Sequence, residues 1–234
     1  MSRPARRIAI VGLYFAAAVA LALAPLLMPQ GYSWLQHTTS ESAAQGLQGA
    51  WLARGGFVLF GFGVLATTLS VASWSVAARA AHAAFGVFMI FAAVFSSRPA
   101  DPGAPFVAVE DTLHSVAASV MGIAFALGIV LVAVRRGSDA WPAITLDGIA
   151  VVASVAIPLA IFTWDEMAGV AQRVMFAIAL TWYITATASQ GRPAAAVDAA
   201  IGAQPAATPF PPTGRSRPPT PPAAAARRLG HAAG

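Results

Sequence analysis

Residues 110–114, EDTLH, place two carboxylates and an imidazole together in a chain that is 58% hydrophobic and only 10% charged. Such side chains can exchange protons, bind a metal ion or form ion pairs. Asp111 and His114 are three residues apart, which puts them on one face of a helix. An acidic residue at a helix N-terminus is stabilised by the helix dipole without any further function. That explanation suffices for Glu110, but it does not account for His114.

A second histidine, His37, precedes two threonines, a serine and a glutamate in the stretch HTTSE. His37, Asp111 and His114 could ligate zinc or another divalent metal. Ser40 or Glu41 could then assist a metal-bound water in hydrolysing a lipid. The chain has no HExxH or HxH spacing to support a metal site and no G-x-S-x-G turn to support a serine nucleophile. We therefore expect no cofactor, keep the metal as an alternative, and assign no catalytic residue.

The hydrophobic composition of the chain indicates that membrane helices position these residues. The mean hydropathy is +0.69 over 234 residues, and apolar runs of about twenty residues, the length that spans a bilayer, recur along the chain. The absence of cysteine excludes disulfides, thiolate zinc sites and cysteine nucleophiles. All fourteen basic residues are arginines that flank apolar segments, which indicates a bacterial source and a lipid environment rather than a nucleic-acid partner.

Six apolar segments predict six transmembrane helices. They run roughly over 8–28, 51–72, 80–95, 113–134, 144–162 and 169–187. The first is too long for the apolar core of a signal peptide, and Pro25 disfavours cleavage after Ala24, so we expect a retained helix. Gly56, Gly61, Gly63, Ser115 and Ser119 are small residues that would allow close helix contact.

The arginines also predict an orientation, because basic residues near segment ends stay on the cytoplasmic side. One set of loops and ends carries Arg3, Arg6, Arg7, Arg79, Arg135, Arg136 and the arginines from Arg192 onward. The alternate loops carry only Arg98, against Glu41, Asp101, Glu110, Asp111, Asp165 and Glu166. We therefore predict an all-α, six-helix integral membrane bundle of a bacterial cytoplasmic membrane, with both termini in the cytoplasm.

Three regions follow from this topology. Residues 1–7 form a basic cytoplasmic N-terminus, and residues 8–187 form the transmembrane domain. Residues 188–234 are rich in alanine and proline and hold too few bulky apolar side chains to order themselves, so we expect a disordered cytoplasmic tail.

Polar residues from every outer loop should converge at the outer end of the bundle. The cluster consists of His37, Ser40, Glu41, Arg54, Asp101, Asp111, His114, Glu166 and Arg173. Arg173 lies within the sixth segment, where an unpaired cation costs about 2.5 kcal/mol or more. We expect it to pair with a carboxylate of a neighbouring helix, such as Asp111. Arg54 has the same need, although it can extend toward the interface.

The remaining polar positions receive structural interpretations. Thr38 and Glu41 have the spacing of a capping box at a helix start. We expect His82 to lie at the membrane interface near Arg79. We expect Asp147 to cap the fifth segment or to pair with an arginine of the preceding loop.

Three stretches of the sequence resemble the bacterial and archaeal membrane family called domain of unknown function 998. They are HTTSESAAQGLQGAWLARGGFVLFG from position 37, RPADPGAPFVAVEDTLHSVAAS from position 98 and GVAQRVMFAIALTWYITAT from position 169. The resemblance covers roughly residues 8–187. It implies a six-helix bundle and singles out His37, Ser40, Asp101, Pro102, His114, Gln172 and Arg173. The resemblance also implies an aspartate directly after the histidine of the fourth helix. This chain has Ser115 at that position, so it departs from the family pattern, and Asp111 is the alternative carboxylate.

Three functions are compatible with these observations. The first is a non-enzymatic membrane protein whose outward polar cluster binds a ligand or lipid headgroup, or holds the bundle together through ion pairs. The second is the metal-dependent lipid hydrolase described above. The third is a small transporter, against which the six segments show no inverted repeat. Membrane lipid is the expected partner in each case.

Overall fold

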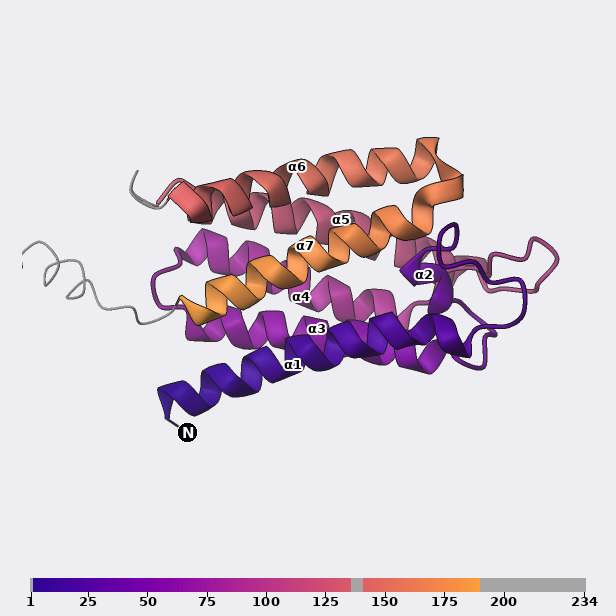
Figure 1. Cartoon of the computed structure of the whole chain (residues 1–234), viewed down its shortest axis with the longest axis horizontal. Coiled ribbons are helices and arrows are strands. Elements are labelled where there is room, and N and C mark those ends of the chain that lie inside the picture. The colour runs from indigo at the N-terminus through magenta and orange to yellow at the C-terminus, as the bar shows by residue number, and fades with distance from the viewer. Residues whose placement is uncertain (1, 136–140, 190–234) are drawn as a thin grey trace, which may run out of the picture. The chain divides into compact units, whose positions relative to one another are not determined.

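The computed structural model describes residues 2–135 and 141–189, and of residues 141–143 the backbone alone. Six of its helices are long and apolar enough to cross a membrane, which confirms the predicted fold class. Figure 1 shows how they are arranged. The six are α1 (Arg3–Leu23), α3 (Ala50–Ser70), α4 (Val76–Val94), α5 (Ala108–Ala133), α6 (Trp141–Thr163) and α7 (Ala168–Ala188).

Three short helices complete the described part of the chain. The 3-10 helix η1 (Ala24–Leu27) extends α1, and η2 (Asp165–Met167) leads into α7. The short helix α2 (Thr39–Ser42) has the predicted capping box, in which the Glu41 carboxylate accepts the Thr38 N–H at 2.6 Å. Glu41 therefore belongs to a short helix of its own that precedes the second membrane segment.

All six membrane helices begin earlier than hydropathy predicts, α4 and α5 among them, and local capping explains the start of α4. The hydroxyl of Ser75 accepts the backbone N–H of Ala78 at 3.1 Å, so α4 begins at Val76 and is long enough to span. Helix α5 begins at Ala108, which places Glu110 and Asp111 in its first turn. His114 follows about one turn later, on the face that turns inward.

The long helices form a closed ring. Each one packs against the next along the chain, and α7 closes the ring against α1 (Figure 1). Among the described elements, helix α6 packs mainly against its neighbours α5 and α7, and it buries the smallest share of its residues. It is therefore the least embedded member of the bundle.

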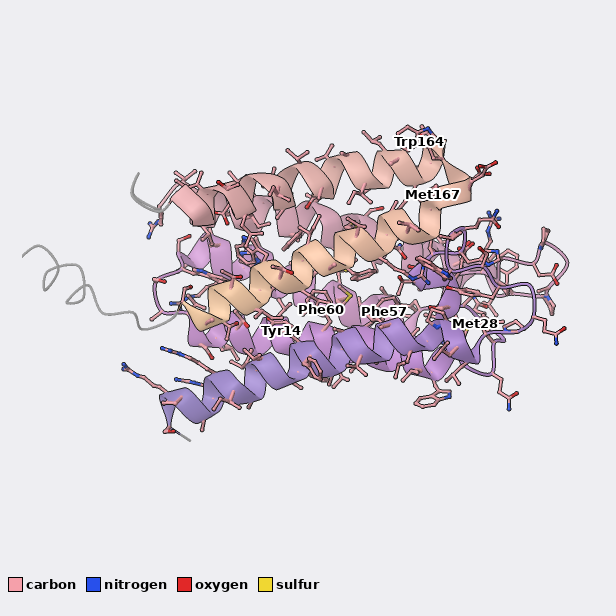
Figure 2. The ribbon with its side chains drawn as sticks, in the orientation of Figure 1. Tyr14, Met28, Phe57, Phe60, Trp164 and Met167 are labelled. Carbon is pink, nitrogen blue, oxygen red and sulfur yellow. The ribbon has the colours of Figure 1, made fainter. Side chains whose placement is uncertain are left out.

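Aromatic side chains fill the centre of the ring. Phe60 contacts Tyr14, Phe85, Phe176 and Tyr183 at centroid separations of 5.6–6.3 Å. Figure 2 labels Tyr14, Phe57 and Phe60 among these core side chains. Because rings from α1, α3, α4 and α7 meet here, this core holds the helices in register.

Close helix approach occurs at the predicted glycines of α3. A Cβ on Gly61 would lie 2.7 Å from the carbonyl oxygen of Gly86 on α4, and one on Gly63 would lie 2.7 Å from the Tyr14 ring. Ser115 and Ser119 behave differently from expectation. Both side chains are exposed, and their hydroxyls donate to carbonyls one turn earlier in α5.

The outward surface carries large apolar side chains of the kind that face lipid. Leu69, Val76 and Phe162 are more than four-fifths exposed. Trp34, Trp51 and Trp164 are also exposed, and all three lie toward the end of the bundle that carries α2. Tryptophans at one level are typical of a membrane interface. The predicted tail lies outside the described residues except for Ala188 and Ser189.

Candidate functional site

Three loops gather with α2 at one end of the bundle (Figure 1), which we call the α2 end. They are residues 28–49, residues 95–107 and residues 164–167. Every residue of the predicted polar cluster lies in these loops or in the helix turns next to them. The opposite end carries the start of α1, the start of α4 and the end of α5, and with them Arg3, Arg6, Arg7, Arg79 and Arg135.

Gln45 joins the first loop to the second. Its amide nitrogen donates to the carbonyls of Ser96 and Val107 at 2.8 and 3.1 Å, and its amide oxygen accepts the Val107 N–H at 2.7 Å. The sequence analysis missed this residue. Nothing in the surrounding alanines and glycines marks it, because its partners are backbone groups more than fifty residues away.

Arg173 joins the first loop to α7. Its guanidinium donates to the carbonyls of Trp34 and His37 at 2.7 and 2.9 Å and to the hydroxyl of Tyr32 at 2.8 Å. The predicted pairing with Asp111 is wrong, since the Asp111 carboxylate instead accepts the backbone N–H of Arg98 at 2.9 Å. Backbone carbonyls satisfy this arginine as well as a carboxylate would, and sequence alone cannot locate them.

Arg54 has a similar structural role. Its Nε and one terminal nitrogen donate to the carbonyls of Ala43 and Ala44, each at 2.9 Å. These carbonyls stand at the C-terminal end of α2, where a helix lacks internal partners for its last carbonyls. Arg54 and Arg173 thus hold loop backbone in place, and neither lines the cavity described next.

A cavity of about 880 Å³ opens between the three loops, α5 and α6, and we call it the vestibule. Its polar lining residues are Gln36, His37, Thr38, Ser40, Glu41, Ser97, Arg98, Asp101, Asp111, His114, Ser115, Asp165 and Glu166. Seven of the nine predicted cluster residues are among them: His37, Ser40, Glu41, Asp101, Asp111, His114 and Glu166. The lining holds five carboxylates and one guanidinium, so it is strongly acidic.

A second cavity of about 390 Å³ lies deeper in the bundle, and we call it the chamber. Its walls are mainly apolar and come from α3, α4, α5, α6 and α7, with Phe57, Met89, Met121, Met175 and Phe176 among them. Five residues line both cavities: Ser40, His114, Ala118, Ile161 and Phe162. The vestibule and the chamber therefore adjoin each other at His114.

Gln172 fixes the wall where the cavities meet. Its amide oxygen accepts the Ser40 N–H at 3.1 Å, and its amide nitrogen lies 3.5 Å from the Ser40 hydroxyl. It lines the chamber but not the vestibule. The hydroxyl of Ser97 donates to the Ser40 carbonyl at 2.9 Å, so the loop 95–107 and helix α7 both bond to α2 at Ser40.

His114 stands at the boundary between the two cavities. It is only 5% exposed, and its Nδ1 lies 2.9 Å from the carbonyl oxygens of both Ala92 and Phe95. Since both partners are acceptors, Nδ1 carries the proton. Nε2 is on the other edge of the ring and has no hydrogen-bond partner within residues 2–135 and 141–189.

The metal alternative was tested against this geometry. In the described part of the chain, no group of three histidine, aspartate or glutamate side chains lies close enough to hold a metal ion. The Nδ1 of His37 accepts the Ser33 N–H at 2.9 Å, and the Nδ1 of His114 faces two carbonyls. His37, Asp111 and His114 therefore do not fit a metal site, and we derive no step through one.

A second polar group lies toward the opposite end of the bundle, and it includes His82, whose surroundings differ from the expected ones. His82 is fully buried, not interfacial, and its ring lies between Trp74 and Trp182 at centroid separations of 4.4 and 4.9 Å. Its Nδ1 is 2.8 Å from the Tyr183 hydroxyl. Asp147 is also buried and accepts the Trp182 indole N–H at 2.6 Å. No cavity described above reaches these residues, so this group serves packing.

Comparison with known proteins returns one family. The model of a family described as protein of unknown function (DUF998) matches residues 9–189, which confirms the resemblance seen in the sequence. No curated protein and no solved structure matches the chain.

Proposed function

The chain belongs to the DUF998 family of proteins of unknown function, and from this premise we propose that it binds an amphiphile through the two adjoining cavities. The polar headgroup occupies the vestibule, and a single apolar tail occupies the chamber. The observation that carries this proposal is the shared lining at Ser40, His114 and Phe162. It joins an acidic compartment to an apolar one, as a molecule with a polar head and an apolar tail requires.

The apolar compartment has a route to the surrounding lipid. Ile123 and Phe162 line the chamber and are also 70% and 87% exposed. They stand on α5 and α6, and α6 is the least embedded helix. An amphiphile could thus enter sideways from the membrane without passing its tail through water, where exposed apolar surface is costly.

The charges support an outward-facing vestibule. Five of the eight described arginines lie at the end opposite α2, and six of the seven described acidic residues lie at the α2 end. The positive-inside rule then puts both termini in the cytoplasm and the vestibule on the outer side of a bacterial cytoplasmic membrane. The ligand would be drawn from the outer leaflet.

The proposal is for binding rather than catalysis. The side chains around the vestibule hold backbone groups: Glu41 bonds to Thr38, and Asp111 bonds to Arg98. Ser40 has its hydroxyl beside the amide nitrogen of Gln172, with no histidine among its hydrogen-bond partners. A nucleophile needs a base within hydrogen-bond reach, and the described residues provide none for Ser40.

Filling the chamber should abolish binding. A Cβ on Gly122 would meet nothing within 4 Å, and Gly122 lines the chamber, so a Gly122→Phe side chain would occupy the space assigned to the tail. We expect affinity for dodecyl-chain amphiphiles to fall by at least about tenfold, or 1.4 kcal/mol. The measurement is equilibrium binding to the purified full-length protein in phosphatidylcholine nanodiscs, with empty nanodiscs as the blank for partitioning.

Gly148→Phe is the matched control. Gly148 lies on an exposed face of α6, its Cβ would also meet nothing within 4 Å, and it lines neither cavity. This variant should bind like the wild type. Equal binding by wild type and Gly122→Phe, at equal melting temperature, would show that the chamber does not hold the tail.

A further inference from the structure

We propose that the headgroup of the bound amphiphile is a primary ammonium, held by the vestibule carboxylates and donating an N–H to Nε2 of His114. This inference rests on the amphiphile-binding function proposed above and specifies its ligand class. It is carried by two independent observations, the charge of the vestibule and the unpartnered nitrogen of His114.

The vestibule carboxylates are not neutralised by pairing. Asp101, Asp111 and Asp165 each use one oxygen to accept a nearby backbone N–H, at 2.9–3.0 Å. The side chain of Glu166 has no hydrogen-bond partner in the described ranges. The guanidinium groups of the neighbouring Arg54 and Arg173 donate hydrogen bonds to backbone carbonyls. With five carboxylates against the single guanidinium of Arg98, the lining of the vestibule has an excess of negative charge and concentrates cations.

His114 distinguishes among cations. Its Nδ1 proton is committed to the carbonyls of Ala92 and Phe95, which leaves the lone pair of Nε2 as the acceptor that the ring offers to a ligand. Such a lone pair needs a donor, and the side chain is 95% buried at the junction of both cavities. A primary ammonium has three N–H donors, enough for Nε2 and two carboxylates together, whereas a tertiary ammonium has one and a quaternary ammonium has none. The headgroup that satisfies both the carboxylates and Nε2 is therefore the primary one.

The position of His114 also sets the placement of the ligand. The carboxylates lie on the vestibule side of the ring, and the apolar walls at Met121, Met175 and Phe176 lie on the chamber side. An ammonium at Nε2 thus leaves its carbon chain directed into the chamber. A short amine would fill only the vestibule and lose the apolar contribution to binding.

The test compares four probes on the wild-type, full-length protein in phosphatidylcholine nanodiscs at low ionic strength. They are dodecylamine, dodecyltrimethylammonium, dodecyl sulfate and ethanolamine. We expect dodecylamine to bind at least about tenfold more tightly than each of the others, because a hydrogen bond to a charged group and the alkyl tail each contribute at least this factor.

A pair of charge-neutralising variants provides the matched control. Glu166 lines the vestibule, whereas Glu110 lies in the first turn of α5 at the same end and lines neither cavity. Glu166→Gln should weaken dodecylamine binding about threefold, and Glu110→Gln should leave it unchanged within experimental error. His114→Phe should reduce the preference for dodecylamine over dodecyltrimethylammonium.

The outcomes separate this inference from the proposed function. If dodecyltrimethylammonium or dodecyl sulfate binds as tightly as dodecylamine, the amphiphile site stands and the primary-ammonium assignment is overturned. If no dodecyl probe binds above the nanodisc blank, or ethanolamine binds as tightly as dodecylamine, the amphiphile site itself is wrong. Because the probe comparison uses the wild-type chain, a variant that fails to fold does not affect it.

Discussion

Replacing Gly169 with alanine is expected to lower the melting temperature by about 6–12 °C, the shift that about 3 kcal/mol produces in a protein of this size. A Cβ at this position would overlap the carbonyl oxygens of Trp34 and His37 and lie 2.8 Å from that of Leu35. All three are backbone atoms, so no side-chain rotation can relieve the overlap. The Val170 N–H donates to the Leu35 carbonyl at 3.1 Å and holds the loop at this distance.

Gly169→Ala should also disturb the structure around the vestibule. The loop that contacts Gly169 carries His37 and leads into α2, so displacing it opens one wall of the vestibule. Hydrogen exchange at residues 32–37 should therefore accelerate in Gly169→Ala. Gly12→Ala is the control, because a Cβ at this exposed position of α1 meets nothing within 4 Å. That variant should gain about 0.4–1 kcal/mol. A Gly169→Ala protein as stable as Gly12→Ala would refute the close contact.

The second large effect is expected at Gly128→Ala in α5. The new Cβ would lie 2.7–2.9 Å from three atoms of the His82 ring. This ring lies between Trp74 and Trp182 and is hydrogen-bonded to Tyr183, so it has no space into which to move. We expect a loss of about 3 kcal/mol, at the upper end of the range for overpacking a core.

Thermal melting in detergent, with a double-mutant cycle, checks this result. Gly122→Ala, in the same helix, adds a Cβ that meets nothing within 4 Å and should not destabilise the protein. In a His82→Ala background, the Gly128→Ala penalty should largely vanish, because the two residues interact directly. A penalty that persists there would mean that the strain lies in α5 itself and not against His82.

The fold could be predicted well from the sequence because the signal for each membrane helix, a run of apolar residues, lies within that helix. Hydropathy located six segments, and arginine positions separated the two ends of the bundle. Small residues in α3 correctly predicted close contacts at Gly56, Gly61 and Gly63. Helix starts were less accurate where a single side chain decides them, as Ser75 does for α4.

The sequence predicted most of the residues that make up the site, but it did not predict the hydrogen bonds that they form. His37, Asp111, His114 and Glu166 face one cavity, as the topology suggested. The partners of the charged residues were wrong, because Arg54, Arg173 and Asp111 all bond to backbone groups of loop residues outside their own helices. Every residue has such groups, so no sequence pattern marks them. The surroundings of His82 were predicted wrongly for a related reason. In the sequence, a histidine that is buried between two tryptophans cannot be distinguished from any other histidine near a helix end.

The chamber could not be predicted from the sequence. It is space left between five helices, and its size depends on where side chains such as Met121, Met175 and Phe176 come to lie. Its connection to the vestibule at His114 depends on the depth of α5 relative to α2, which only the assembled bundle determines.

Photolabelling tests the central claim most directly. A single-chain dodecylamine with a photoreactive diazirine at the end of its tail is bound to the full-length protein and irradiated, and the labelled residues are identified by mass spectrometry. We predict labels on Met121, Ser154 and Met175, which line the chamber from α5, α6 and α7. Gly122→Phe should remove these labels. Labels confined to outward-facing residues such as Phe15 and Leu69, with none on the chamber residues, would contradict the account.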